Sequence, residues 1–206
     1  MAIIVKQNLV NSTKWDIKCP YSMNPQYICV HNTANDASAA NEISYMISNN
    51  NQVSFHIAVD EKEAIQGIPL NRNAWAAGDG ASGTGNRKAI HIEICYSKSG
   101  GWKFEQAEKN AAKLIAQMLA ERGWGIERVK THKDFSGKNC PHRTLSIGWA
   151  SFLNMVKHEL KLIQDSKVYY RVVVGSYLDK TAAEKAVQEL KNKGYSGTFI
   201  ATYKPE

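Results

Sequence analysis

The chain of 206 residues lacks the features that mark membrane, secreted and disordered proteins. No apolar run approaches the roughly 20 residues that a membrane-spanning helix needs, so we expect no membrane segment. The N-terminus has no basic start, apolar core and cleavage site in succession, which predicts synthesis in the cytoplasm without a signal peptide. The composition, 43% hydrophobic and 22% charged, is typical of a globular protein and excludes a disordered or fibrous chain.

Cysteine is scarce, and its positions show no paired spacing. Cys19, Cys29, Cys95 and Cys140 are dispersed along the chain, so we expect no disulfide framework. The first three are expected to be small buried side chains. Cys140 differs, because polar residues surround it in a predicted loop where a thiol finds little apolar surface.

Acidic residues are fewer than basic ones, 19 against 26, which gives a net charge of +7 and a pI near 9.2. This balance predicts an anionic partner, and nucleic acid, a membrane surface and bacterial wall polymers all carry that charge. The basic residues form no dense tract and no recognisable nucleic-acid module. We therefore expect no nucleic-acid partner and no membrane partner.

Hydrophobic periodicity predicts alternating strands and helices. Alternating apolar residues predict strands, at residues 27–31, 53–59, 64–68 and 90–96 and around Val129. Apolar residues at helical spacing predict helices, at residues 37–49, 104–122 and 149–163. The acidic turn between 53–59 and 64–68 predicts a hairpin that forms a second sheet ribbon.

The glycine-rich segment 78–88 resembles a phosphate-binding loop only in part. Gly80 and Gly85 have the spacing of that motif, but Asn86 stands where its lysine would follow. A flexible loop beside a substrate groove is the preferred interpretation.

An acidic residue interrupts the apolar strand 90–96. Alternation places Ile90, Ile92 and Ile94 on one face, and His91 and Glu93 on the other. Burying a carboxylate is costly without a partner, and a catalytic cation is one such partner. An exposed polar row on an edge strand explains the pattern equally well.

The segment from Thr131 to His142 contains half of a possible catalytic zinc site. His132 and Cys140 offer an imidazole nitrogen and a thiolate sulfur, both of which bind zinc well. A catalytic zinc site has three protein ligands and an open fourth position, so a third ligand must lie elsewhere.

A composition break at residues 164–166 separates a short tail from the rest of the chain. The tail predicts a β-α-β unit, with strands at 168–177 and 198–201 and a helix that Thr181 caps. We therefore divide the chain into domains 1–164 and 165–206. So short a tail buries only a thin core and needs to dock or to pair with another copy.

Four separated motifs resemble those of the zinc-dependent N-acetylmuramoyl-L-alanine amidases of the type-2 family, which includes phage endolysins and bacterial autolysins. They are Val30-His31-Asn32-Thr33, Trp75-Ala76-Ala77-Gly78, Ile92-Glu93-Ile94 and His132-x5-Lys138-x-Cys140-Pro141. The resemblance covers roughly residues 20 to 160. It implies an α/β fold with a central mixed β-sheet flanked by helices.

The resemblance also implies roles for individual residues. His31, His132 and Cys140 match the three zinc ligands, Glu93 matches the general base, and Lys138 matches the group that stabilises the oxyanion. The implied reaction is hydrolysis of the amide between the lactyl group of N-acetylmuramic acid and L-alanine in peptidoglycan, with zinc-bound water as nucleophile. The enzyme would act on the bacterial cell wall after release. The alternative is a catalytically inactive peptidoglycan-binding protein of the same fold.

Several positions depart from the family pattern or remain open. Phe55 stands where some relatives have a tyrosine that assists the reaction, and Ala76 replaces a common histidine. His142 is a rival ligand to Cys140 because of its closeness in sequence, and His56 is a candidate for lining the cleft. Trp75 either packs under the substrate groove or fills the core. His158, on the last predicted helix of the first domain, is expected to be solvated.

The tail resembles a SPOR-type peptidoglycan-binding module, although only part of the usual length is present. This resemblance implies that the tail grips glycan strands. A homodimer through the C-terminal module, or contact with the amidase domain, would complete the missing sheet.

Overall fold

The computed structural model describes residues 2–166 and 173–204 of the chain. Contacts divide the chain into two compact units, Met1–Lys167 and Val168–Glu206, and each is described by itself. None of the helices in the described ranges combines the length and the apolar character needed to cross a membrane.

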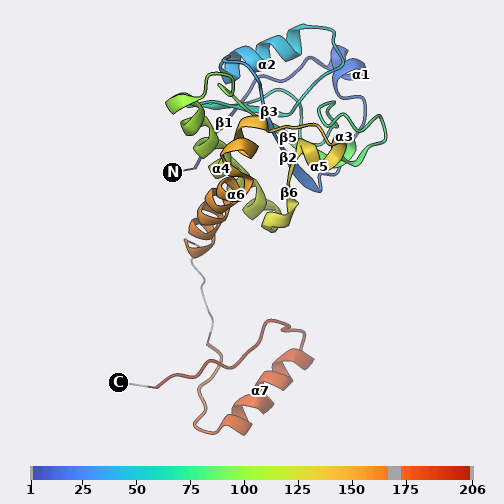
Figure 1. Cartoon of the computed structure of the whole chain (residues 1–206). Coiled ribbons are helices and arrows are strands. Elements are labelled where there is room, and N and C mark those ends of the chain that lie inside the picture. Colours follow the sequence, from blue (N-terminus) through green and yellow to red (C-terminus); the bar gives the residue numbers. More distant parts are fainter. Residues whose placement is uncertain (1, 167–172, 205–206) are drawn as a thin grey trace. The chain divides into compact units, whose positions relative to one another are not determined.

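The first unit is built on one six-stranded sheet (Figure 1). Its order is β1-β4-β3-β5-β2-β6. The strands are β1 (Val5–Gln7), β2 (Tyr27–Asn32), β3 (Ile57–Val59), β4 (Ala64–Gln66), β5 (Ala89–Ile94) and β6 (Val129–Thr131). Among these described strands, β3 and β4 pair antiparallel, and the other neighbours pair parallel. The prediction of a central mixed sheet is confirmed.

The hairpin of β3 and β4 is confirmed, but its prediction as a second ribbon is wrong. Strand β3 also pairs with β5 in parallel, which joins the hairpin to the main sheet. The strand begins at Ile57 rather than residue 53, because Ser54 bonds outside the sheet. Its N–H donates to the carbonyl of Trp75, and its hydroxyl donates to that of Lys18.

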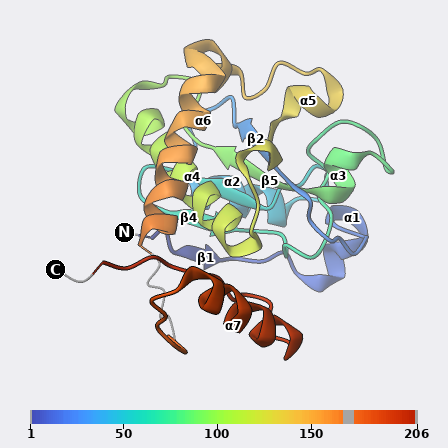
Figure 2. The ribbon, with the colours of Figure 1, turned by 90° about the horizontal axis from the view of Figure 1, so that it is seen from below.

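Helices cover both faces of the sheet. They are α1 (Trp15–Lys18), α2 (Ala39–Ser48), α3 (Thr84–Lys88), α4 (Gly101–Arg122), α5 (His132–Ser136) and α6 (His142–Asp165). Helices α4 and α6 lie side by side on one face, and α2 lies on the opposite face (Figures 1 and 2). Glycines end or interrupt the two long helices: Gly123 closes α4 with φ 64°, and Gly148 breaks α6 with φ 136°.

Alternation along the central strands separates the core from the site. Ile28 and Val30 of β2 and Ile90, Ile92 and Ile94 of β5 are fully buried against α4 and α6. Burying each such side chain contributes about 1.5–3 kcal/mol. The intervening residues, His31 and Glu93 among them, point to the other face. Strand β5 lies inside the sheet, between β3 and β2, so the edge-strand interpretation of Glu93 is wrong.

Among its described residues, the second unit contains the predicted helix and no strand. Helix α7 (Lys180–Asn192) begins after Asp179, whose carboxylate accepts the N–H of Thr181, so the cap is Asp179 rather than Thr181. Residues 173–177 and 198–201 form no strand, and the rest of the first predicted strand lies outside the described residues. A strand forms only where a neighbouring strand pairs with its backbone, and no strand is assigned to the described residues of this unit.

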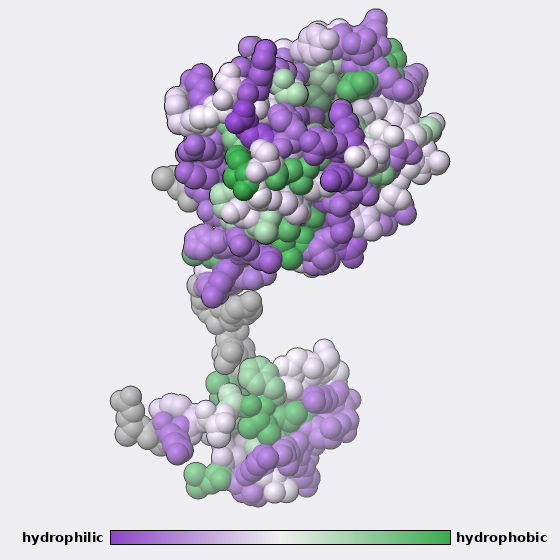
Figure 3. Space-filling model, viewed as in Figure 1, coloured by the Kyte–Doolittle hydropathy of each residue, from purple (hydrophilic) through white to green (hydrophobic). Residues whose placement is uncertain are grey.

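Apolar side chains are exposed on the second unit, and Figure 3 shows them on its surface. None of the residues of α7 is buried. Among the described residues before it, the large exposed apolar ones are Val173, Val174, Tyr177 and Leu178.

Candidate metal centre and active site

Three segments distant in the sequence meet at the carboxyl ends of parallel strands. His31 is near the end of β2, Glu93 is near the end of β5, and His132 follows β6 directly. The strands β5, β2 and β6 are adjacent and parallel, so these ends share one edge of the sheet. The register places His31 directly opposite Glu93. Open α/β sheets commonly bind ligands at this edge.

His31, His132 and Cys140 form a compact group of potential metal ligands. Their ligand atoms all lie within 4.8 Å of one another, and all three residues are buried. Nδ1 of His31 lies 3.1 Å from Nδ1 of His132 and 3.8 Å from Sγ of Cys140. Two imidazoles and one thiol are a donor set that zinc accepts, and three ligands leave the fourth tetrahedral position free.

A capping box holds His132 at the start of α5. The hydroxyl oxygen of Thr131 accepts the N–H of Asp134 at 3.1 Å, and the Asp134 carboxylate accepts the N–H of Thr131 at 2.7 Å. His132 is the first residue of this helix, so its backbone is fixed between β6 and the cap. Gly78 lies beside His132, since a Cβ on it would be in ordinary contact with Nε2 at 3.6 Å, and its φ of 67° is in the left-handed region that favours glycine.

Asn32 holds the cysteine segment against the strand that carries His31. Its Oδ1 accepts the N–H groups of Arg143 at 2.9 Å and of Thr144 at 3.1 Å, which caps the start of α6. Its own backbone N–H donates to the Cys140 sulfur. One residue therefore positions Cys140 relative to His31, a role that the sequence analysis missed.

Burial sets the protonation of the three potential ligands. It lowers the pKa of His31 well below the usual value and lowers that of His132, so both imidazoles are held neutral and ready to coordinate. Burial raises the pKa of the Cys140 thiol to about 11, although the N–H of Asn32 opposes this shift. The thiol must therefore lose a proton when a metal binds.

Glu93 and Lys138 line the same cleft as the three ligands. The cleft has a volume of about 690 Å³. Oε2 of Glu93 is buried and has no hydrogen-bond partner among the described residues. Burial raises the pKa of Glu93 to about 8, and the positive charge of Lys138 opposes the shift. The Lys138 side chain is exposed, so a cation faces the cleft from its rim.

Three further histidines, His56, His142 and His158, lie outside the ligand group. His56 does not line the cleft: it is fully buried, and its Nε2 donates to the Arg72 carbonyl at 2.9 Å. Phe55 lines the cleft instead, because consecutive side chains of an extended segment point in opposite directions. His142 lines the cleft but does not belong to the three-residue ligand group. His158 is exposed on α6, as expected.

The glycine-rich segment contains a short helix, α3, where the sequence predicted a loop. The carboxylate of Asp79 accepts the N–H groups of Gly85 and Asn86, which stabilises this turn of helix. Oδ1 of Asn86 in turn accepts the N–H groups of Ala76 and Ala77. Asn86, which stands where a phosphate-binding loop would have its lysine, therefore supports the wall of the cleft. Both Trp75 and Ala76 line that wall, so the groove interpretation of Trp75 is favoured over core filling.

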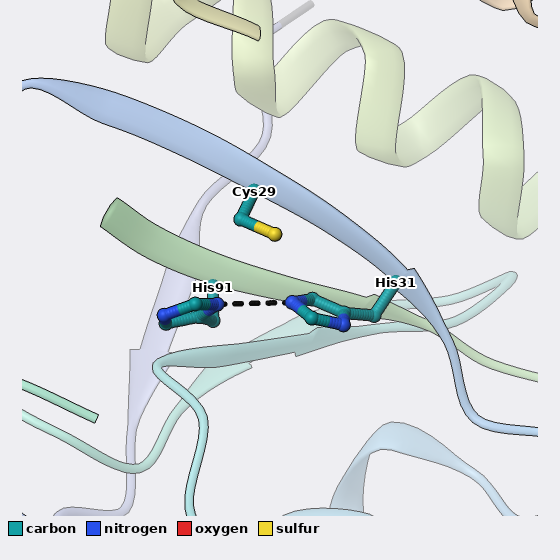
Figure 4. Close-up of side chains that lie close together, drawn as sticks. All are labelled: Cys29, His31 and His91. Atoms are coloured by element: carbon teal, nitrogen blue, oxygen red, sulfur yellow. Dashed lines mark hydrogen bonds between the residues drawn. The ribbon is translucent and has the colours of Figure 1, made fainter. Parts of the chain in front are cut away.

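His91 is a further buried residue that the sequence analysis left without a role. Its Nδ1 lies 2.9 Å from Nε2 of His31 (Figure 4). Together with Cys29, these two histidines form a second group whose ligand atoms lie within 4.8 Å of one another. The signal was the alternation that put His91 on the same face of β5 as Glu93, but the partner depended on the strand register.

Comparisons with known proteins agree with this geometry. The family model described as N-acetylmuramoyl-L-alanine amidase matches residues 21–143, and the SPOR domain model matches residues 153–202. The N-acetylmuramoyl-L-alanine amidases CwlA and XlyB of Bacillus subtilis are similar to the chain. CwlA is 60% identical over 162 residues, which cover 78% of this chain and 60% of CwlA. XlyB is 55% identical over 192 residues, which cover 89% of this chain and 61% of XlyB.

Solved structures show the same fold. The structure of PlyL is 55% identical, with a TM-score of 0.73, over 75% of this chain and 97% of that one. The solution structure of the PlyG catalytic domain is 57% identical, also with a TM-score of 0.73, over 77% and 96%. The chain spans about 60% of the length of the curated relatives CwlA and XlyB. It belongs to the N-acetylmuramoyl-L-alanine amidase family, which its residues 21–143 represent, and carries a SPOR-domain match after them.

Proposed function

We propose that the chain is a peptidoglycan hydrolase that cleaves the amide bond between the lactyl group of N-acetylmuramic acid and L-alanine of the stem peptide. The observation that carries this proposal is the convergence of His31, His132 and Cys140 beside Glu93 in one cleft. Family membership supports the choice of reaction, since the relatives CwlA and XlyB are named for this activity.

The residues of the cleft fit a zinc ion. His31 and His132 would bind it through Nδ1, and Cys140 would bind it through Sγ. Zinc bound there would polarise a carbonyl group and lower the pKa of a water molecule toward about 7. The two imidazoles are already neutral, and the capping interactions of Thr131 and Asn32 hold the ligand segments in place.

Glu93 is the proposed general base. It would take a proton from the attacking water on a carboxylate oxygen and deliver it to the departing nitrogen of L-alanine. Its raised pKa, about 8, makes it a strong base for a carboxylate once it is ionised. The positive charges of a bound cation and of Lys138 favour that ionised form.

Lys138 is the proposed second catalytic group. Its ammonium group lies at the rim of the cleft and would stabilise negative charge on the carbonyl oxygen as water adds. Phe55 lines the cleft without a hydroxyl group, so it can donate no hydrogen bond to that oxygen. Glu93 and Lys138 are therefore the side chains proposed to act in catalysis.

The alternative, an inactive peptidoglycan binder, is disfavoured by the cost of the site. A carboxyl group with an unpartnered buried oxygen and a raised pKa destabilises the fold above its usual pKa. A general base needs such a carboxyl group, whereas a protein that only binds peptidoglycan does not.

The tail is proposed to bind the wall and to form a homodimer. The SPOR match covers residues 153–202, which include the last part of α6 and most of the tail, and it supports glycan binding. The exposed apolar side chains of the tail, Val173, Val174, Tyr177 and Leu178, support association with a second copy of the chain. Light scattering that gives a monomer, together with an excised tail that stays folded, would contradict the dimer.

A defined muropeptide tests the reaction. Incubation with N-acetylmuramoyl-peptide should yield free N-acetylmuramic acid and a peptide with a new L-alanine amino terminus, as detected by mass spectrometry. Glu93→Gln should abolish the products, whereas Glu105→Gln, the same change at an exposed position of α4, should not. Cleavage within the peptide or between sugars would overturn the proposed specificity.

A further inference from the structure

A chain of buried histidines lies behind the candidate metal centre. His31, His91 and His56 are each at most 2% exposed. His91 lies 2.9 Å from His31, between Nδ1 and Nε2, and its own Nε2 lies 3.0 Å from the carbonyl oxygen of Gly85. Figure 4 shows the rings of His31 and His91 directed toward each other.

These contacts fix which ring nitrogen carries each hydrogen. The carbonyl of Gly85 can only accept, so the hydrogen of His91 is on Nε2. The Nδ1 of a neutral His91 is then an acceptor and must receive the Nε2–H of His31. The hydrogen of His31 is thereby placed on Nε2, and its Nδ1 keeps a free lone pair. That Nδ1 is the atom that faces His132 and Cys140.

His56 helps to hold His91 in place by binding its backbone N–H and by stacking on its ring. Its Nδ1 accepts the backbone N–H of His91 at 2.9 Å, and its Nε2 donates to the carbonyl of Arg72 at 2.9 Å. The rings of His56 and His91 are stacked, with centroids 5.7 Å apart. His91 is therefore held through its backbone, its ring face and its Nε2.

We propose that His91 is a positioning residue for the metal centre, which fixes the orientation and the tautomer of His31 so that Nδ1 is presented to the metal. Histidine ligands generally depend on a partner for their second nitrogen, and loss of that partner typically costs about 10–100-fold in metal affinity. The inference rests on the proposed role of His31 as a zinc ligand.

The same residues do not favour a second metal site. Cys29, His31 and His91 bring three ligand atoms together, but a hydrogen lies between the facing nitrogens of the two histidines. A metal on either of those nitrogens would have to displace it. Burial also raises the pKa of the Cys29 thiol well above its usual value, which disfavours the thiolate that a metal requires.

Two substitutions test the positioning role. His91→Leu removes the acceptor for His31, whereas His91→Asn keeps an acceptor oxygen close to the position of Nδ1. Zinc affinity, measured by competition with a chromogenic chelator, should fall about 10–100-fold in His91→Leu and by less in His91→Asn. His158→Leu is the matched control, because His158 is exposed on α6, and it should leave zinc affinity unchanged.

Nitrogen NMR of the original chain provides the second readout. Long-range ¹H–¹⁵N correlation spectra should show His31 with its hydrogen on Nε2, both without zinc and with zinc on Nδ1. This measurement decides the question even if His91→Leu fails to fold. A hydrogen on Nδ1 of His31 in the zinc-free chain, or unchanged zinc affinity in a folded His91→Leu, would overturn the inference.

The outcomes also separate this inference from the proposed function. Absence of zinc binding by the original chain would defeat the metal centre itself. Tight zinc binding that both His91 substitutions leave unchanged would defeat only the positioning role. Two zinc ions per chain, one of them lost in Cys29→Ala, would instead assign the buried group to a second metal site.

Discussion

Replacing Glu93 with glutamine should stabilise the zinc-free protein and abolish the activity of the zinc-loaded protein. Burial raises the pKa of Glu93 from 4.5 to about 8. Below pH 4.5 the folded and unfolded chains both hold the proton, so the carboxyl group has no effect on the pH dependence. Between pH 4.5 and about 8 only the unfolded chain ionises, so stability falls by about 1.4 kcal/mol per pH unit. Above that range the loss is constant.

The magnitude follows from the interval between the two pKa values. At pH 7 the interval above 4.5 is 2.5 units, which corresponds to a loss of roughly 3 kcal/mol in the zinc-free chain. Glutamine does not titrate, so the gain in unfolding free energy from Glu93→Gln should increase from pH 5 to pH 8. Zinc should reduce the gain, because a nearby cation favours the carboxylate of the original chain.

Urea unfolding at pH 5, 6, 7 and 8, with and without zinc, measures this gain. Titrations shared by the two chains cancel in the difference. Glu105→Gln, on the exposed surface of α4, should give a difference close to zero at every pH. A gain for Glu93→Gln that does not change with pH would refute the reasoning, because the carboxyl group would then not be held protonated by burial.

Three further substitutions address the ligands and their supports. Cys140→Ser should weaken zinc binding by more than about 100-fold, because it removes a ligand rather than the partner of one; equilibrium dialysis measures this. Lys138→Met should lower kcat by about 100–1,000-fold, because the Lys138 ammonium group stabilises the oxyanion. It should not weaken zinc binding, because the same positive charge repels the metal. Muropeptide kinetics measure kcat, and competition with a chelator measures zinc affinity. Asn32→Ala should destabilise the chain by about 1–3 kcal/mol, because two N–H groups at the start of α6 lose their acceptor; unfolding at constant pH tests this.

Local patterns in the sequence predicted much of the first unit. Alternation in β2 and β5 separated Ile90 and Ile92 from His91 and Glu93, because side chains of a strand alternate between two faces. The four family motifs also named His31, His132 and Cys140, which the fold brings within reach of one metal ion. Their role as zinc ligands stays a prediction.

Features that depend on strand pairing could not be predicted from local sequence patterns. His91 supports His31 only because β2 and β5 are adjacent and parallel in one particular register, and no local pattern specifies that register. The hairpin of β3 and β4 was predicted correctly, but its attachment to β5 is a long-range pairing. Strands were also predicted at residues 173–177 and 198–201, and none forms there, because β-propensity alone does not specify the neighbouring strand that a sheet requires.

The most direct test of the proposed function is the release of new amino termini from purified cell wall. We predict that L-alanine amino termini accumulate without new reducing sugar ends, that a chelator stops their release, and that added zinc restores it. Cys140→Ser and Glu93→Gln should each abolish the release. Release that persists in both variants, or its absence from the zinc-loaded original chain, would contradict the assignment of a zinc amidase.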